Sequence, residues 1–246
     1  MDPSMSQNIV LLTATITPRA NQPGLAIVDP LDRINDYKRA LGFYDRLLNE
    51  GVIDGVIFVE NSGHDLDALR ALYPDPRIEW LSTYDMDYPS SFHRGYGEFR
   101  LIDHAMSRSK SVAAMPAEAV VWKVTGRYIV ENLVKVIRFA PKKFDLYCAS
   151  TDQWTEMSLM AWTRHGHAAL LRGIWESFGT GMAPELFLAP RLAREQRADC
   201  IVVREFVWPP LISGRRGTDG GQFTGWLTRW KFRVALLPRL ARKLLL

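Results

Sequence analysis

The sequence predicts an α/β protein built on a mostly parallel central sheet. Short apolar, β-branched runs alternate with helical patterns over the first two thirds of the chain. The helical segments between these runs are roughly 10–15 residues long, the length that crossover helices need. A chain of 246 residues with 47% hydrophobic and 24% charged residues can bury a sizeable core. This composition excludes disordered, collagen-like and coiled-coil chains.

Five apolar runs mark the predicted strands. The first, Ile9–Thr15 (IVLLTAT), is short, rich in apolar residues and followed by a loop that contains several Pro and Gly residues. The other four strands are predicted at Val56–Val59, Ile78–Ser82, Val120–Val124 and Phe144–Ala149.

Helical periodicity fills the intervals between the strands. Apolar positions at a spacing of three to four residues follow Asp32 and Asn35, either of which can cap a helix that ends at Gly51. Two further helices are predicted over residues 65–72 and 97–108.

The last third of the chain is less regular. Residues Trp154–Phe178 are predicted as helix, with breaks near Gly166 and Gly173. A second helix is expected over Pro184–Arg197, because proline suits the first turn. The alternation in Cys200–Val207 predicts a strand.

Charge is distributed unevenly along the chain. No acidic residue follows Asp219, whereas residues 229–243 carry six lysines and arginines. Without these six, the net charge of +4 becomes −2 for residues 1–219, so a nucleic-acid footprint over the body of the protein is not expected.

The basic segment 226–246 is amphipathic. Its apolar side chains fall on one arc of a helix: Trp226, Leu227, Trp230, Val234 and Leu237. An apolar face bordered only by cations is typical of binding to anionic lipid, although such a helix could instead dock on its own core or form a dimer contact. With no run of about 18 apolar residues and no secretory signal, we expect a cytoplasmic protein that binds peripherally to the inner face of the cell membrane.

Ligands of parallel α/β sheets bind outside the carboxyl ends of the strands. This rule selects the strand ends that carry Thr13, Thr15, Asn61 and Ser62. The usual nucleotide motifs, GxxxxGK[ST] and GxGxxG, are absent. The cysteines Cys148 and Cys200 form no CxxC pattern, and His165 and His167 are more often structural than metal ligands in such an apolar stretch.

Two loops and one strand end carry the remaining candidate residues. Asp85 and Asp87 form a DxD triplet, which can hold Mg²⁺ or Mn²⁺ but is also common among solvated loop acids. The fourth strand ends in a cation, a hydroxyl, a glycine, a second cation and a tyrosine: Lys123, Thr125, Gly126, Arg127 and Tyr128. Lys123 and Arg127 could neutralise a departing diphosphate without a metal, or they could belong to an ordinary surface turn.

Upstream of that strand, Gly95, Tyr96, Gly97 and Glu98 open a helix, whose N-terminus attracts anions. Glu98 there is either a favourable partner of the helix dipole or a group that acts on the substrate.

The spacing of GYGE, a helix and KVTGRY, with an early ENSG turn and a late PPxxxGxxG segment, resembles small bacterial glycosyltransferases of lipopolysaccharide, capsule or O-antigen assembly. The resemblance spans residues 9–225. It implies a GT-A-like, Rossmann-type three-layer sandwich that binds a nucleotide sugar, with a donor half at residues 8–150 and an acceptor half at 151–225. Residues 1–225 would form this single domain and 226–246 a tail. In that layout the fourth strand delivers a metal-binding DxD, whereas this chain has Thr125-Gly126-Arg127 there. This difference favours neutralisation of the diphosphate by basic side chains over neutralisation by a metal.

An inverting glycosyltransferase also needs a general base. The candidates in the last third are Glu176, Glu185 and Asp152, with Glu185 preferred because it begins a helix on the acceptor side, although it could simply stabilise that helix. Glu98 could also handle a sugar hydroxyl or act as the base. Asp152 could instead bind a sugar hydroxyl. We therefore expect a glycosyltransferase with a glycan or lipid-linked acceptor. The alternatives are a non-catalytic membrane-surface scaffold and another nucleotide-dependent transferase.

Overall fold

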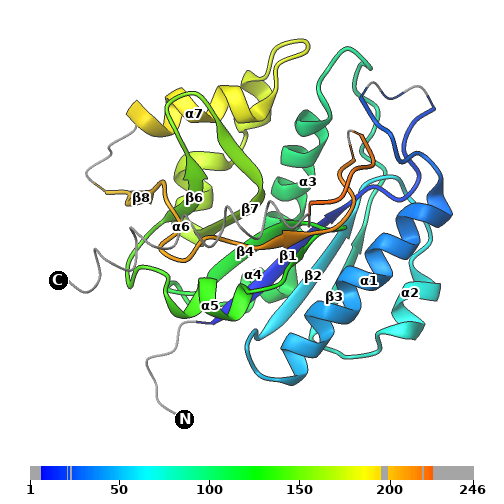
Figure 1. Cartoon of the computed structure of the whole chain (residues 1–246), viewed down its shortest axis with the longest axis horizontal. Helices are drawn as coiled ribbons and strands as arrows, with labels where there is room; N and C mark the ends of the chain where they lie inside the picture. The colour runs from blue at the N-terminus through cyan, green and yellow to red at the C-terminus, as the bar shows by residue number, and fades with distance from the viewer. Residues whose placement is uncertain (1–6, 21, 23, 195–198, 218, 224–246) are drawn as a thin grey trace.

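A seven-stranded sheet runs through the molecule. The computed structural model describes residues 7–20, 22, 24–194, 199–217 and 219–223. The strand order is β3-β2-β1-β4-β7-β6-β8, and β7 alone runs against the direction of the other six (Figure 1). The strands are β1 (Asn8–Ala14), β2 (Gly55–Glu60), β3 (Ile78–Ser82), β4 (Val120–Thr125), β6 (Leu146–Ser150), β7 (Thr155–Thr163) and β8 (Val202–Val203). The predicted α/β fold with a mostly parallel sheet is confirmed.

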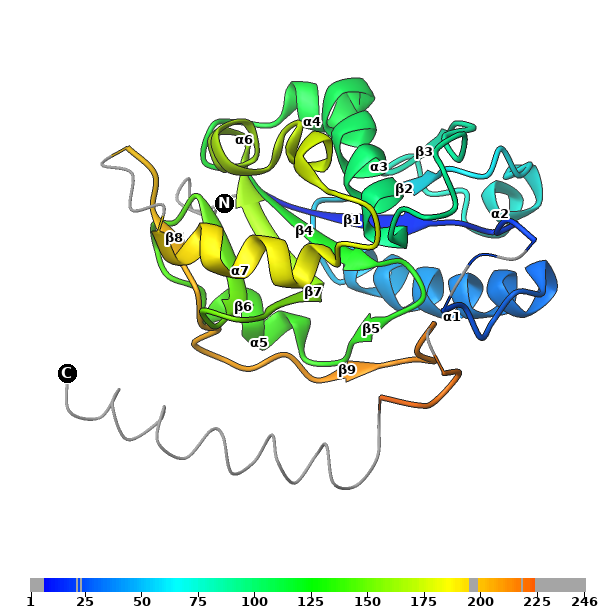
Figure 2. The same cartoon turned by 90° about the horizontal axis from the view of Figure 1, so that it is seen from above.

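Helices cover both faces of this sheet and make three layers (Figure 2). They are α1 (Pro30–Asn49), α2 (Asp67–Leu72), α3 (Arg94–Arg108), α4 (Lys110–Ala114), α5 (Leu133–Arg138), α6 (Arg164–Gly166), the π-helix η1 (His167–Leu171), the 3-10 helix η2 (Ile174–Ser177) and α7 (Pro184–Arg194). A separate two-stranded sheet pairs β5 (Ile129–Val130) with β9 (Ile212–Ser213).

Alternation along β1 divides the core between the two faces. Val10 and Leu12 belong to a cluster with residues of α1, α2 and α5, whereas Ile9 and Leu11 belong to a second cluster with residues of α3, α4 and α7. Because successive side chains of a strand point to opposite faces, one apolar strand supports both layers.

Helix α1 begins one turn before the capping residues proposed from the sequence. Asp29 is the N-cap: its carboxylate accepts a hydrogen bond of 2.7 Å from the Leu31 amide, and Pro30 follows it. The prediction of Asp32 or Asn35 as the cap is wrong, because an acidic N-cap followed by proline gives the earlier start a bonded amide and a fixed φ. Helix α3 likewise begins early, at Arg94, with His93 as its N-cap.

The predicted helix over Trp154–Phe178 is wrong in its first part. Residues Thr155–Thr163 form β7, which lies between β4 and β6 and pairs with both in the antiparallel sense. A short apolar run satisfies a buried strand and a buried helix equally well, and here two neighbouring strands supply the hydrogen bonds that decide. The predicted strand Cys200–Val207 is reduced to Val202–Val203.

The strand order reverses between β1 and β4. From β1 the chain builds β2 and β3 on one side, then crosses back to place β4 on the other side of β1. Such a reversal leaves a crevice at the carboxyl ends of the two strands, because the connections that follow them leave in opposite directions. The described residues contain no helix long and apolar enough to cross a membrane. The predicted membrane-binding segment 226–246 lies outside the described residues.

Candidate functional site

A cavity of about 360 Å³ opens at the carboxyl ends of β1 and β4. Thr13 and Thr15 line it from the end of β1, and Thr125, Arg127 and Tyr128 line it from the end of β4. The volume falls within the range of small-molecule sites. Five arginines and three glutamates also line the cavity: Arg19, Arg33, Arg94, Arg127 and Arg216 with Glu98, Glu156 and Glu185.

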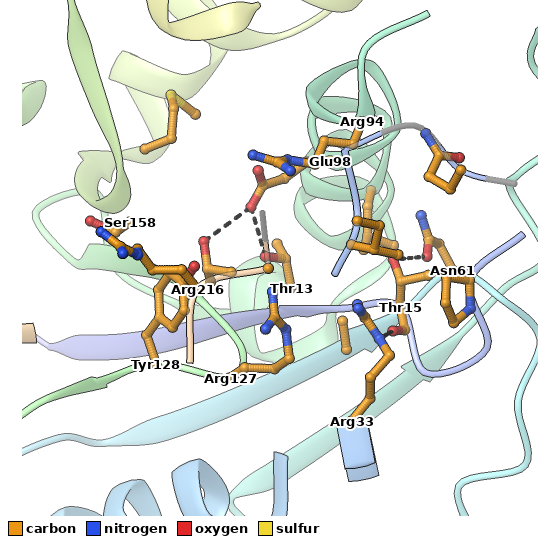
Figure 3. Close-up of a pocket in the computed structure, with 18 of the residues that line it drawn as sticks. Thr13, Thr15, Arg33, Asn61, Arg94, Glu98, Arg127, Tyr128, Ser158 and Arg216 are labelled. Carbon is orange, nitrogen blue, oxygen red and sulfur yellow. Dashed lines mark hydrogen bonds between the residues drawn. The ribbon is translucent and has the colours of Figure 1, made fainter. Parts of the chain in front are cut away.

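Glu98, which lines the cavity, forms an ion pair with Lys123. Lys123 is fully buried, its Nζ lies 2.6 Å from Glu98 Oε1, and it donates to the Met157 carbonyl at 2.6 Å. Thr13 and Thr125 donate to the same Glu98 oxygen at 3.0 and 3.5 Å (Figure 3). Lys123 does not line the cavity, so its charge serves Glu98.

Burial opposes ionisation of Glu98, but the neighbouring positive charge outweighs it. The Lys123 ammonium, with hydrogen bonds from Lys123 and Thr13, lowers the pKa of Glu98 below its ordinary 4.5. Glu98 therefore stays a carboxylate near neutral pH, and with its Oε1 already bonded it suits holding a hydroxyl better than taking a proton.

Arg127, unlike Lys123, brings its positive charge into the cavity. Its side chain turns into the cavity, opposite Glu98 and Arg94 (Figure 3), and the residue is only 5% exposed. Its Nη1 donates to the Arg215 carbonyl at 3.0 Å, which fixes the guanidinium. A Cβ on Gly217 would lie 2.6 Å from Arg127 Nη2, so only glycine leaves room for this position.

Most of the arginines that line the cavity form no salt bridge with a described residue. Arg33 donates to the Thr15 and Ile27 carbonyls, and Arg94 donates to the Gly24 carbonyl. Arg19 lies over the Tyr88 ring. Within the described part of the chain, none of Arg19, Arg33, Arg94 or Arg127 forms a salt bridge with a carboxylate. Guanidinium groups that form no salt bridge in a concave site are typical of anion binding.

Glu185 faces the cavity from the first turn of α7. Its Oε2 is buried and has no hydrogen-bond partner among the described residues. Burial raises the pKa of Glu185, and the negative charge of Glu98 raises it further. A carboxylate with an open oxygen and a raised pKa has the properties of a general base.

The predicted residues at the end of β2 are divided between the cavity and its support. Asn61 lines the cavity, and its Oδ1 accepts a 2.6 Å hydrogen bond from Thr15 Oγ1. Ser62 lies outside the lining and contacts the buried Glu60 carboxylate, while its Oγ accepts from the Thr17 amide at 3.0 Å. Ser62 therefore holds the loop after β1 in place.

The predicted glycines act through close packing. A Cβ on Gly126 would lie 2.6 Å from the Thr13 carbonyl oxygen, so glycine lets β4 close against β1. Gly95 and Gly97 leave room in the same way for Pro184 and Tyr88. Tyr96 packs on neighbouring rings, including Tyr88 at 5.0 Å between centroids, and does not line the cavity.

No family model matches this chain, and no curated protein matches it. Among solved structures, it is similar to a protein from Desulfovibrio desulfuricans G20 provisionally described as a nucleotide-diphospho-sugar transferase (TM-score 0.48, 13% identity, covering 81% of this chain and 79% of that chain). It is also similar to the inositol-1-phosphate CTP transferase of T. maritima (0.47, 10%, 95% and 97%) and to a 4-diphosphocytidyl-2C-methyl-D-erythritol synthase (0.44, 10%, 94% and 100%). Likenesses at this level do not establish a shared activity.

The predicted metal ligands Asp85 and Asp87 both contact one guanidinium. Arg100 forms a salt bridge with Asp85 and lies 3.3 Å from Asp87 Oδ1, and neither acid lines the cavity. A cation bound between these carboxylates would have to displace Arg100. The acids therefore do not fit a Mg²⁺ or Mn²⁺ site in this arrangement, and a metal there stays a prediction that the ion pair opposes.

A different group could hold a metal ion. Among the described residues, ligand atoms of Asp145, His165 and Cys200 lie within 4.8 Å of one another. They lie near the start of β6 and the end of β7, at the sheet edge opposite the cavity. His167 points elsewhere, with its Nε2 2.9 Å from Asp103 Oδ1.

Sequence reasoning missed several residues that line the cavity. Arg33 and Arg94 come from helices, which a search of strand ends does not cover. Glu156 and Ser158 come from β7, which was predicted as helix. Their alternation with the apolar residues Met157 and Leu159 is the signal that could have revealed them.

Proposed function

We propose that this protein is a nucleotide-dependent transferase, and within that class a glycosyltransferase that moves a sugar from a nucleotide donor to a lipid-linked or growing surface polysaccharide. The observation that carries the proposal is the set of four arginines without carboxylate partners at the point where the strand order reverses. Phosphate groups are the natural ligands of such a set, because guanidinium groups bind them bidentately.

The donor would lie along the cavity. Thr15 and Asn61, whose side chains are hydrogen-bonded to each other, would contact the nucleoside end of the donor. Arg127 would contact the phosphate that leaves, because it enters the cavity from β4. Thr13, Thr125 and Glu98 would contact sugar hydroxyls, since their hydrogen bonds converge on one carboxylate oxygen.

Transfer needs one proton to move. The acceptor oxygen forms a bond to the anomeric carbon, the bond from that carbon to the phosphate oxygen breaks, and the electron pair stays with the nucleotide. The acceptor's proton goes to Glu185, whose open oxygen faces the cavity. Arg127 stabilises the negative charge that grows on the phosphate, so this chain would need no metal for that purpose.

The same charge pattern suits a second candidate, a transferase that moves a nucleotidyl group. The two reactions release different products. Glycosyl transfer releases a nucleoside mono- or diphosphate, whereas nucleotidyl transfer from a nucleoside triphosphate releases pyrophosphate. Identifying the released phosphate species therefore decides between them.

Donor binding tests the proposal. The full chain is screened by thermal shift with UDP-, GDP-, dTDP- and CMP-linked sugars, with and without EDTA. We expect at least one nucleotide class to raise the melting temperature, with EDTA making no difference. A chain stabilised by no member of the panel would be a scaffold, and the proposal would fail.

Membrane association is a separate part of the proposal. We expect the full chain to sediment with vesicles that contain phosphatidylglycerol and to remain in solution with neutral phosphatidylcholine vesicles. Deletion of residues 226–246 should abolish sedimentation. Equal sedimentation with both vesicle types would contradict the role assigned to the basic side chains.

A further inference from the structure

A second hollow of about 480 Å³ adjoins the donor cavity. The end of β6, the turn into β7 and residues 204–206 and 209–210 line it. Trp154 and Glu156 line both the hollow and the donor cavity, so these two residues form the boundary between them. A molecule in the hollow would therefore lie directly beside the donor.

Trp154 presents a large apolar surface at this boundary. The residue is 47% exposed, although tryptophan is usually well covered. Thr151 fixes the turn that carries it: Thr151 Oγ1 accepts from the Trp154 amide at 3.0 Å, and the Thr151 amide donates to the Trp154 carbonyl at 2.8 Å. An exposed indole on a fixed backbone is a flat surface ready to pack against a ligand.

Polar groups surround that surface. Ser150, Thr151 and Arg204 line the hollow, and Arg204 forms a 2.7 Å salt bridge with Asp152. Asp152, predicted to bind a sugar hydroxyl, is 79% exposed and reaches the rim of the hollow through this contact. Hydroxyl, guanidinium and carboxylate groups around an aromatic face match a pyranose ring, which has an apolar face and an edge of hydroxyls.

Glu156 is held in position at the boundary. Its Oε1 accepts from the Ser158 amide at 3.0 Å and from Ser158 Oγ at 2.7 Å. Its Oε2 accepts no hydrogen bond from the described residues. The carboxylate is therefore oriented by its own strand and has one oxygen available for a ligand.

We propose that this hollow is the acceptor subsite and takes a pyranose ring of the acceptor glycan. The ring packs on Trp154, and Glu156 accepts a hydrogen bond from a ring hydroxyl at the boundary. This inference rests on the proposed glycosyltransferase function, because it takes the adjacent cavity as the donor site.

Sugar binding in the absence of donor tests the subsite. The ¹⁵N-labelled full chain is titrated with methyl glycosides of glucose, galactose, mannose, N-acetylglucosamine and rhamnose, and the indole signal of Trp154 is assigned from Trp154→Phe. We expect this signal to shift saturably with at least one glycoside, with a Kd on the order of 1–10 mM. Trp154→Ala should weaken that Kd by about tenfold, as measured on backbone signals of residues 150–156. Tyr84→Ala is the matched control, because Tyr84 is an exposed aromatic residue that lines neither space.

Three outcomes would separate the claims. If nucleotide sugars bind but no methyl glycoside shifts the Trp154 signal, the subsite is refuted and the proposed function stands. If methyl glycosides bind but no nucleotide sugar does, the proposed function fails and the hollow remains a sugar site. If n-octyl glucoside shifts the signal and methyl glucoside and the other methyl glycosides do not, the occupant is an alkyl chain and the subsite is refuted.

Discussion

Polar side chains differ between the amino-terminal edge of the central sheet, where its parallel strands begin, and the carboxyl-terminal edge, where those strands end. At the amino-terminal edge, polar groups bond to one another: Asn8 Oδ1 accepts from Trp122 Nε1 at 2.8 Å, and Asp54 accepts from the Asn8 amide at 2.7 Å. Asp145 there accepts from Thr163 Oγ1 at 3.0 Å and from the Ile201 amide at 2.8 Å. At the carboxyl-terminal edge, Arg127 lacks a carboxylate partner among the described residues, and Glu185 Oε2 has no hydrogen-bond partner there.

This difference indicates which edge binds a ligand. A buried polar group without a partner costs free energy, so a protein keeps one where something else supplies the partner. Arg127 and Glu185 both line the cavity at the carboxyl ends of β1 and β4, whereas the bonded groups at the amino-terminal edge contribute to the stability of the fold. Variants at the two edges should therefore fail in different ways.

The largest expected effect on stability comes from breaking the ion pair between Glu98 and Lys123. Lys123→Met leaves the partly buried Glu98 carboxylate without its cation, and the free energy of unfolding should fall by about 3 kcal/mol. Urea unfolding monitored by circular dichroism measures this. Adding Glu98→Gln to Lys123→Met should recover a large part of the loss, because the unpaired charge is gone. A single Lys123→Met variant as stable as the wild type would show that Glu98 does not depend on the pair.

The same pair gives a pH dependence. Because the folded pKa of Glu98 lies below its ordinary 4.5, the pair stabilises the fold fully above pH 4.5. That contribution is lost as the pH falls from 4.5 through the lowered folded pKa. Wild-type stability should therefore drop over that acidic interval, and the drop should be smaller in the double variant Lys123→Met/Glu98→Gln.

Glu185→Gln tests the open carboxylate. If Glu185 is the base, turnover should fall by about a hundredfold or more, while stability stays the same or rises because a buried carboxylate is removed. The base must be ionised, so wild-type kcat/KM should fall as the pH falls through a pKa raised above 4.5. The residual kcat/KM of Glu185→Gln should not fall over that pH range. An unchanged pH profile in the variant would assign the proton to another group.

At the opposite edge, Asp145→Ala should show the reverse behaviour. It removes the acceptor for the Thr163 hydroxyl and the Ile201 amide, so unfolding should become easier by about 1–3 kcal/mol. Turnover at a temperature where the variant is folded should equal that of the wild type. A tenfold loss of turnover in the folded variant would mean that the two edges are not separate in function.

The smallest effect is expected at the DxD triplet. Asp87 is 71% exposed in its ion pair with Arg100, so Asp87→Asn should change stability by no more than about 0.5 kcal/mol. Turnover should be unchanged, with or without EDTA. If turnover is lost in the variant and also in EDTA, Asp87 binds a required metal. The basic side chains of the cavity then do not neutralise the departing phosphate by themselves.

The sequence predicted the elements whose signals are local. The strand ends at Thr13, Asn61 and Arg127 were predicted because a parallel sheet gathers the carboxyl ends of its strands along one edge. Strand β7 was missed because its identity depends on its neighbours β4 and β6, which are distant in sequence.

Contacts between distant segments could not be predicted. The pairing of Glu98 with Lys123 joins α3 to β4, and neither helix periodicity nor strand alternation specifies it. The space that Gly126 leaves for Thr13 is likewise a property of two strands packed together. Arg33 and Arg94 enter the cavity only because α1 and α3 pack against the sheet.

Turnover of the Arg127→Ala variant tests the central claim most directly. Arg46→Ala is the matched control, because it removes the same charge from an exposed position on α1 far from the cavity lining. With the nucleotide sugar that stabilises the wild type, Arg127→Ala should remain folded and lose donor turnover by about a hundredfold, while Arg46→Ala keeps it. Equal turnover in the two variants would contradict the role of the cavity arginines in neutralising the departing phosphate.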